Sequence, residues 1–159
     1  MPGSGKSTLG RGLALDMGLT FVDLDNEIQL KKGKTIAKIF EDEGENVFRS
    51  LESKALKEIS NRIDSFVMST GGGAPCFHQN MKFMNKEGQT IYLSIGLEEL
   101  VKRLESERKT RPLLTGSKSL KTKVENLLNT RSDIYKQSKI VIESDLITVA
   151  DLRNALVKN

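Results

Sequence analysis

The sequence predicts an α/β protein in which a parallel sheet is covered by helices on both faces. Short apolar runs alternate along the chain with longer stretches whose apolar residues recur at helical spacing. The short runs are apolar throughout, without alternating polar residues, and this is typical of strands buried on both faces. The chain has 159 residues, of which 37% are hydrophobic and 29% charged, so we expect one soluble domain over residues 1–159.

The first half of the chain contains two expected strands and two helical stretches. The first helix follows residues 1–5, carries Leu9, Leu13 and Met17 at helical intervals, and ends at Gly18, which suits a left-handed cap. Residues 20–24 and 65–70 are apolar and predict strands. Between them, residues 25–63 are predicted to be mostly helical, with a short apolar face of Ile36, Ile39 and Phe40 and a longer one of Val47, Leu51, Leu56, Ile59 and Ile63.

The second half repeats the alternation. Residues 80–86 predict a short helix, residues 90–95 a strand, and residues 97–107 a helix with leucines at helical intervals. A polar stretch broken by Pro112 and Gly116 follows and is expected to be a mobile lid over residues 105–118. The last expected elements are a helix at 120–135, a strand at 139–144 and an amphipathic helix at 149–159.

Composition excludes several classes of function. The formal net charge is +4, but 25 Lys and Arg residues are spread among 21 acidic residues without a dense basic run, so we expect a small anionic substrate and no nucleic acid. No apolar stretch is long enough to span a membrane, and no secretory signal is visible. A single cysteine cannot build a disulfide framework, so we expect a reducing, cytoplasmic location.

Residues 3–8, GSGKST, match the second half of the phosphate-binding pattern G-x-x-x-x-G-K-[ST]. Backbone amides of Gly3, Ser4 and Gly5 would surround phosphate oxygens at a helix N-terminus, and Lys6 would reach the terminal phosphates. The hydroxyl of Ser7 would bind Mg²⁺, with ATP as the nucleotide. The alternative is a flexible Gly/Ser turn that leads into a helix.

Asp23 and Asp25 follow a predicted strand at a spacing of two, so we expect their side chains to point to the same side. One carboxylate can serve the metal shell, and the other can face a substrate hydroxyl as a base or an orienting acceptor. The alternative is that Asp25 caps the following helix.

Arg49 follows Phe48 in a helix whose apolar face is otherwise aliphatic, so its guanidinium is expected near the core boundary, where it could clamp a carboxylate. A solvated i,i+3 pair with Glu52 is equally compatible with the pattern. Residues 71–73 are three consecutive glycines after a strand, which suits close approach to a ligand. Arg111 and Arg131 could neutralise phosphate or substrate charge, or could be ordinary solvated side chains.

Cys76 and His78 are metal-ligand types, but no second pair accompanies them, so we do not expect a zinc site.

Together, the segments GSGKST, FVDLDNEI, IFEDEGENVFRSLE, STGGGAP, RPL and TRSDIY resemble the shikimate kinase family in order and approximate spacing, from residue 1 to about residue 136. The resemblance implies a nucleoside-monophosphate-kinase-like P-loop kinase fold with strand order 2-3-1-4-5. It also implies transfer of the γ-phosphoryl group of ATP, with Mg²⁺, to the 3-hydroxyl of shikimate, in the pathway to chorismate and aromatic amino acids.

The resemblance assigns roles to individual residues. Catalysis falls to Lys6, Asp25 and Arg111, and the metal to Ser7 directly and Asp23 through water. Helices in 24–63 would bind the substrate, and Arg103 and Arg108 compete for the place over adenine. The expected ATP-binding residues are Gly3, Ser4, Gly5, Lys6, Ser7, Thr8 and Arg111, and the expected substrate-binding residues are Asp25, Phe40, Phe48, Arg49, Gly71, Gly72, Gly73 and Arg131.

Family members have a strand before the phosphate loop, at the centre of the sheet, and this chain shows only four strands. We therefore expect the sequence to be a truncated form that is less stable than one extended by about ten residues. We expect a monomer whose partners are ATP or ADP and shikimate. The alternatives are a gluconate or nucleoside monophosphate kinase, and a non-catalytic binding module of the same fold.

Overall fold

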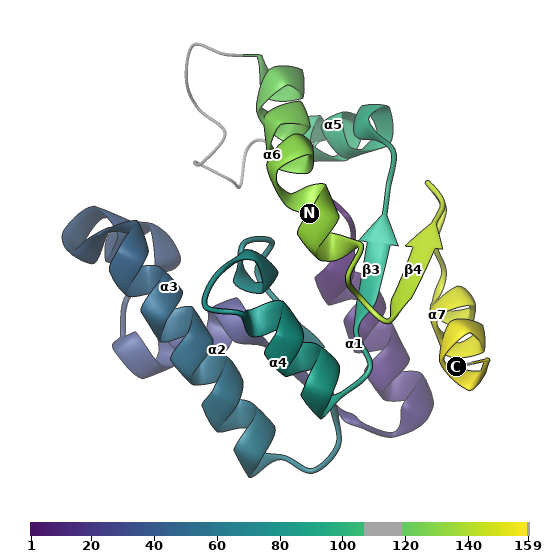
Figure 1. Cartoon of the computed structure of the whole chain (residues 1–159), viewed down its shortest axis with the longest axis horizontal. Coiled ribbons are helices and arrows are strands. Elements are labelled where there is room, and N and C mark those ends of the chain that lie inside the picture. Colours follow the sequence, from purple (N-terminus) through teal and green to yellow (C-terminus); the bar gives the residue numbers. More distant parts are fainter. Residues whose placement is uncertain (107–118, 159) are drawn as a thin grey trace.

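The computed structural model describes residues 1–106 and 119–158, and within them every expected helix and strand forms (Figure 1). One short 3₁₀ helix, η1, which the sequence did not predict, follows the three glycines. The elements are α1 (Lys6–Met17), β1 (Thr20–Asp23), α2 (Leu24–Lys32), α3 (Ile36–Arg62), β2 (Phe66–Ser69), η1 (Ala74–Cys76), α4 (Asn80–Glu87), β3 (Ile91–Ser94), α5 (Leu97–Ser106), α6 (Leu120–Tyr135), β4 (Ile140–Glu143) and α7 (Val149–Val157).

The strands form two separate parallel pairs. β1 pairs with β2 in a register that runs from Thr20 opposite Phe66 to Asp23 opposite Ser69. β3 pairs with β4 from Ile91 opposite Ile140 to Ser94 opposite Glu143. In residues 1–106 and 119–158, β2 and β3 are not bonded to each other, so each presents one unpaired edge. This arrangement agrees with the order 2-3-1-4-5 without its central strand.

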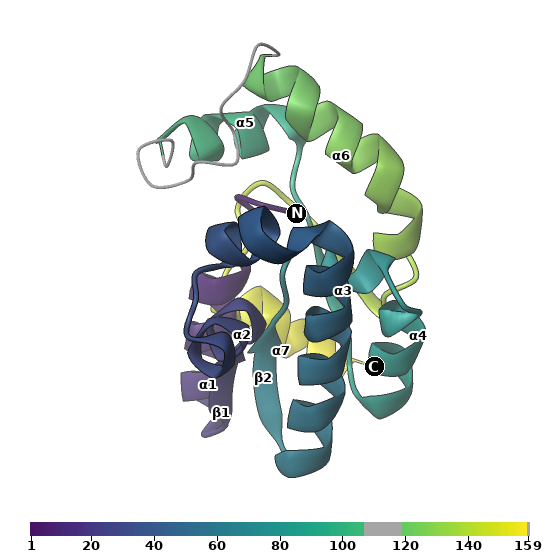
Figure 2. The same cartoon turned by 90° about the vertical axis from the view of Figure 1, so that its left-hand side faces the viewer.

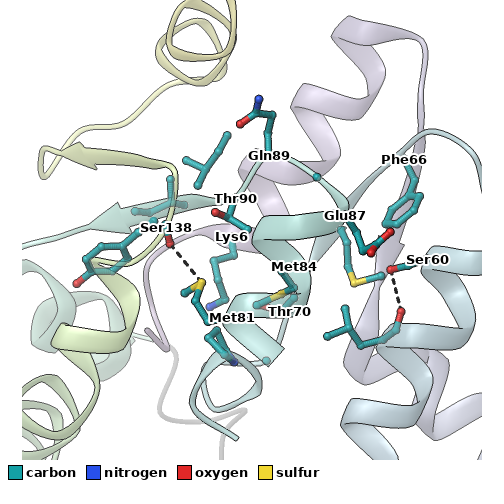
Figure 3. A pocket seen from close by; sticks show the side chains of 18 of the residues that line it. Lys6, Ser60, Phe66, Thr70, Met81, Met84, Glu87, Gln89, Thr90 and Ser138 are labelled. Atoms are coloured by element: carbon teal, nitrogen blue, oxygen red, sulfur yellow. Dashed lines mark hydrogen bonds between the residues drawn. The ribbon is translucent and has the colours of Figure 1, made fainter. Parts of the chain in front are cut away.

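A groove of about 430 Å³ lies between β2 and β3. Its walls include Phe66 and Met68 from β2 and Ile91 and Leu93 from β3, and methionines of α4 reach into it (Figure 3). Lys6 lies at the same groove. The groove therefore connects the interior of the sheet layer with the phosphate loop.

Helices cover both faces of the strand pairs (Figures 1 and 2). On one face, α2 and α3 pack on β1 and β2 through a cluster that includes Val22, Ile28 and Leu56. On the other face, Leu13 of α1 packs with Leu93 of β3 and Leu152 of α7. Because α1 also contacts β1 and β2, it bridges the two strand pairs. A third cluster joins α5 and α6 to the end of β3.

Three details of the predicted packing were wrong. Val47 is 40% exposed, so it does not belong to the buried face of α3. Met17, at the end of α1, is also exposed, because the helix runs past the core there. β4 is covered on one face only, since Ile140 is buried whereas Val141 is 39% exposed.

The stretch expected to be mostly helical over 25–63 is divided in two places. α2 ends at Gly33, whose φ of 63° gives a left-handed cap, and α3 contains a kink at Gly44 with φ 82° and ψ 170°. Glycine tolerates both conformations because it has no Cβ. The kink separates the first turns of α3 from the segment that carries Phe48 and Arg49.

None of the described helices is long and apolar enough to cross a bilayer.

Candidate active site

The phosphate loop is shaped by two glycines. Gly3 and Gly5 have φ of 74° and 81°, and Gly5 is the N-cap of α1 without a side-chain cap bond. The amides at the start of α1 are therefore not capped by a side chain and point beyond the helix end, where an anion binds favourably. An alanine at position 3 would also place its Cβ 2.9 Å from Cγ of Leu104.

Polar side chains of the loop contact each other and the neighbouring strand ends. The Lys6 ammonium donates to the Met1 carbonyl at 2.7 Å, and the Ser4 hydroxyl donates to the same carbonyl at 2.9 Å. The Ser7 hydroxyl donates to Oδ2 of Asp23 at 2.9 Å and lies 3.0 Å from the hydroxyl of Ser69. The ends of β1 and β2 thus meet the start of α1 at Ser7.

The two aspartates do not share a strand face, and this part of the prediction was wrong. β1 ends at Asp23, and Asp25 lies in the first turn of α2. Asp23 itself caps α2, because its Oδ1 accepts from the amide of Asn26 at 3.3 Å. The capping role that the sequence left open for Asp25 therefore belongs to Asp23, and the side chain of Asp25 is directed elsewhere.

Asp25 and Glu52 meet at Gly71. A Cβ on residue 71 would lie 2.8 Å from Oδ1 of Asp25 and 2.8 Å from Oε1 of Glu52. Such distances are far below van der Waals contact, so a side chain on residue 71 would displace one or both carboxyl groups. The sequence predicted that the glycine run allows close approach of a ligand. At Gly71 the groups that approach the backbone are the carboxyl groups of Asp25 and Glu52.

Arg49 is buried and held by two acids. Its Nε and Nη2 both donate to Oε1 of Glu45, at 3.1 and 2.9 Å, and its Nη1 donates to Oε2 of Glu52 at 2.9 Å. The i,i+3 pair with Glu52 does form, but it is buried: Glu52 is 0% exposed, which contradicts the solvated pair considered from the sequence. The pair lies at the core boundary, as the placement of Arg49 beside Phe48 predicted.

Burial raises the pKa of Glu52 to about 7, against the opposing effect of the Arg49 guanidinium and with a smaller contribution from the Asp25 charge. Its Oε1 has no hydrogen-bond partner among the described residues. Near neutral pH, this carboxyl group can therefore be either protonated or charged.

Aromatic rings surround the guanidinium. Cζ of Arg49 lies 4.5 Å from the ring centre of Phe77, 5.1 Å from that of Phe48 and 5.8 Å from that of Phe40. The rings of Phe40 and Phe48 themselves are 4.7 Å apart. A Cβ on Gly73 would lie 2.4 Å from Nη1 of Arg49, so the third glycine is also required by a side chain that packs against it.

Arg131 and Arg103 flank the loops. Arg131 lies on α6, and its Nη1 is 3.7 Å from the place that a Cβ on Gly72 would occupy. The hydroxyl of Tyr135, one turn further along α6, donates to the Gly72 carbonyl at 2.5 Å, and burial raises its pKa to about 12. Arg103 on α5 donates from Nε to Glu99 at 2.8 Å, and its Nη1 is 3.9 Å from the Cβ position on Gly5.

Thr8 lies in the first turn of α1 and is exposed. Arg108, Arg111 and residues 107–118 of the expected lid lie outside the described residues.

Sequence reasoning missed three partners of the site: Glu45, Phe77 and Ser69. Glu45 is the i,i+4 neighbour of Arg49 on α3, so helical spacing could have found it, whereas Phe77 and Ser69 are brought to their neighbours only by the fold. Glu52 was noticed as an i,i+3 neighbour of Arg49, but no local pattern predicts that its carboxyl group is buried.

The site has two parts, joined by one short segment of chain. At one end, Ser69 meets Ser7 and the phosphate loop. At the other, Gly71 packs on Asp25 and Glu52, and Gly73 packs on Arg49. A helix start without a side-chain cap, a carboxylate and a buried guanidinium are thus held within a few residues of each other along β2 and its following loop. This arrangement suits the alignment of a phosphorylated ligand with a second ligand that carries a hydroxyl and a carboxylate.

Comparisons with known proteins agree with this arrangement. The family model described as shikimate kinase matches residues 2–158. A shikimate kinase from Parabacteroides distasonis is 41% identical over 98% of this chain and 93% of its own length.

Two solved structures superpose closely. A shikimate kinase from Bacteroides thetaiotaomicron has a TM-score of 0.87 at 34% identity, over 98% of this chain and 90% of its own. A shikimate kinase from Acinetobacter baumannii in complex with shikimate has a TM-score of 0.87 at 36% identity, over 99% of this chain and 87% of its own.

Proposed function

The chain belongs to the shikimate kinase family, and from this premise we propose that it transfers the γ-phosphoryl group of ATP to the 3-hydroxyl of shikimate. Membership makes it an ATP-dependent small-molecule kinase. The contacts of individual site residues support this activity in this chain.

The observation that supports the proposal most is the contact path along residues 69–73. Ser69 contacts Ser7 at the phosphate loop, and Gly73 packs on Arg49. Shikimate has a carboxylate at one end and hydroxyls at the other. A ligand with its carboxylate on Arg49 would therefore extend towards Asp25 and the nucleotide phosphates.

The phosphate end of the site is built from residues 3–8. The amides at the start of α1 would bind phosphate oxygens, and Lys6 would exchange its contact with the Met1 carbonyl for the terminal phosphates. The Ser7 hydroxyl and the Asp23 carboxylate lie 2.9 Å apart and are the hard oxygen ligands that Mg²⁺ prefers, so these residues would hold the ion. When bound, Mg²⁺ neutralises charge on the transferred phosphoryl group.

The substrate end aligns the hydroxyl. Arg49 and Arg131 would hold the carboxylate, and Phe40 and Phe48 would shield it from water. Asp25 would accept the hydrogen bond of the 3-hydroxyl and take its proton as the oxygen bonds to the γ-phosphorus. The bond from the γ-phosphorus to the bridging oxygen breaks, and ADP leaves with that oxygen. Since phosphoryl transfer requires mainly alignment and charge neutralisation, these groups suffice.

We also propose that the chain acts as a monomer in the cytoplasm. In that compartment ATP is available and the single cysteine, Cys76, stays reduced. Light scattering after gel filtration should give the mass of one chain, and a dimer mass would contradict this part.

A substrate panel tests the function. ADP release should require shikimate and should not occur with gluconate or nucleoside monophosphates. Arg49→Lys should raise KM for shikimate, because lysine cannot form two parallel bonds, whereas Arg62→Lys on the same helix should not. Turnover with another acceptor would replace the proposal by a different kinase. Calorimetric binding of shikimate without turnover would indicate a binding module.

A further inference from the structure

Glu52 is a buried acid to which the mechanism above gives no role. Its side chain lies on α3 with Oε2 bonded to Arg49 and Oε1 without a hydrogen-bond partner among the described residues. A buried carboxylate with an unpaired oxygen costs more free energy than the protonated carboxyl group, because the charged form loses more hydration. The group thus has a physical reason to bind a proton.

Charged groups face Glu52 from each element packed around it. Arg49 lies on the same helix, Asp25 comes from α2 and Arg131 from α6. Cys76 of η1 is also close, and burial raises the pKa of its thiol, which keeps it neutral. The two arginines favour a charged Glu52, whereas Asp25 and burial favour a neutral one.

Arg49 connects Glu52 to the place where the substrate carboxylate is proposed to bind. Its guanidinium already bonds to two acids, Glu45 and Glu52, inside a shell of phenylalanine rings. A substrate carboxylate would be a third negative group beside Arg49, with Arg131 as a second cation nearby. Because Arg49 and Glu52 are largely buried, the negative charges of Glu52 and of the substrate would repel each other strongly.

We propose that docking of the shikimate carboxylate on Arg49 is coupled to uptake of one proton by Glu52, which makes Glu52 a positioning residue. The inference rests on the proposed function, because it requires shikimate to bind at Arg49. The proton comes from solvent and is carried by Glu52 while the substrate is bound. Glu52 then still accepts a hydrogen bond from Arg49 but no longer adds negative charge beside the substrate.

The coupling predicts the direction of a pH effect. In the free protein, the pKa of Glu52 is about 7, so the carboxyl group is mostly charged above neutral pH. If the bound form keeps the proton, shikimate affinity should weaken by up to about tenfold per pH unit above pH 7. At about pH 8 the complex should take up nearly one proton per shikimate bound. Below neutral pH, Glu52 is already protonated, and its contribution to uptake should vanish.

Calorimetry of the full chain with shikimate alone measures this uptake directly. Titrations at about pH 8 in phosphate and in Tris differ in heat by the number of protons exchanged, because the two buffers have different ionisation enthalpies. Glu52→Gln, which mimics the protonated acid, should bind without uptake and lose the pH dependence of affinity. Glu58→Gln is the matched control: it removes an exposed carboxylate from the same helix, one whose pKa is lowered by Lys31.

Uptake in the wild type that persists in Glu58→Gln and disappears in Glu52→Gln would support the proposal. Equal heats in both buffers for the wild type would overturn it, even if Glu52→Gln did not fold. Uptake that persists in Glu52→Gln would also overturn it. Absence of any shikimate binding would overturn the proposed function and this inference with it, whereas binding without proton exchange would leave the proposed function standing.

Discussion

Replacing Gly73 with alanine displaces the guanidinium on which substrate binding is proposed to depend. The added Cβ would lie 2.4 Å from Nη1 and 2.6 Å from Cζ and Nη2 of Arg49. Gly73 has φ −84° and ψ −24°, a conformation that alanine adopts without strain. The substitution therefore acts through this contact and not through the backbone.

The size of the displacement sets the expected loss. Ordinary contact begins at 3.4 Å, so the guanidinium must retreat by about 1 Å. The rings of Phe77 and Phe48 and the bonds to Glu45 and Glu52 leave it little room to do so in place. A misplacement of about 1 Å can cost about 100-fold in rate, or about 2.7 kcal/mol. We expect kcat/KM for shikimate to fall by that factor, while KM for ATP changes by less than about twofold.

Steady-state kinetics with each substrate varied in turn would measure both constants. Gly88→Ala is the matched control, because nothing lies within 4 Å of its added Cβ, and its kinetics should equal those of the wild type. A Gly73→Ala enzyme with an unchanged kcat/KM for shikimate would refute the argument that Arg49 is held in register by close packing on residue 73. A loss of equal size in Gly88→Ala would refute it as well.

Three further predictions follow from the same contacts. Lys6→Met should lower kcat/KM for ATP by about 100-fold or more in the coupled assay, through loss of the ammonium at the transferred phosphate, and leave calorimetric binding of shikimate intact. Between about pH 4.5 and pH 7 the folded chain holds a proton on Glu52 that the unfolded chain has lost. The free energy of unfolding, measured by urea unfolding, should therefore fall with rising pH by roughly 3 kcal/mol more in the wild type than in Glu52→Gln. Parallel pH profiles of the two proteins would contradict this. An apolar strand of about ten residues fused before Met1 should fill the groove between β2 and β3 and raise the melting temperature by several degrees, whereas a Gly/Ser extension of equal length should not.

Local pattern was enough to predict the order of the α-helices and strands and the glycine-rich turn before α1. Helical spacing and apolar runs located every described α-helix and strand, because most of these segments bury one continuous apolar face, whereas the short 3₁₀ helix η1 was not predicted. The end of β1 at Asp23 was not predictable in this way, because the apolar pattern predicts a strand to residue 24, whereas α2 already begins at Leu24. The period-two argument for the two aspartates failed for that reason.

The details of the site depend on contacts between distant parts of the chain. Arg49 was identified by its place beside Phe48, and its i,i+4 partner Glu45 follows from helical spacing. Phe77, in contrast, reaches Arg49 only through the loop after β2. The convergence of Asp25 and Glu52 on Gly71 joins three segments that share no motif. Contacts of this kind determine how many negative charges lie beside Arg49, and they form only when the chain folds.

The most direct test of the account is the structure of this chain with ADP and shikimate bound. The account predicts phosphates on the amides of residues 3–8, the shikimate carboxylate on Arg49 and Arg131, and the 3-hydroxyl facing Asp25. Shikimate bound away from Arg49, or with its carboxylate towards the phosphates, would contradict it.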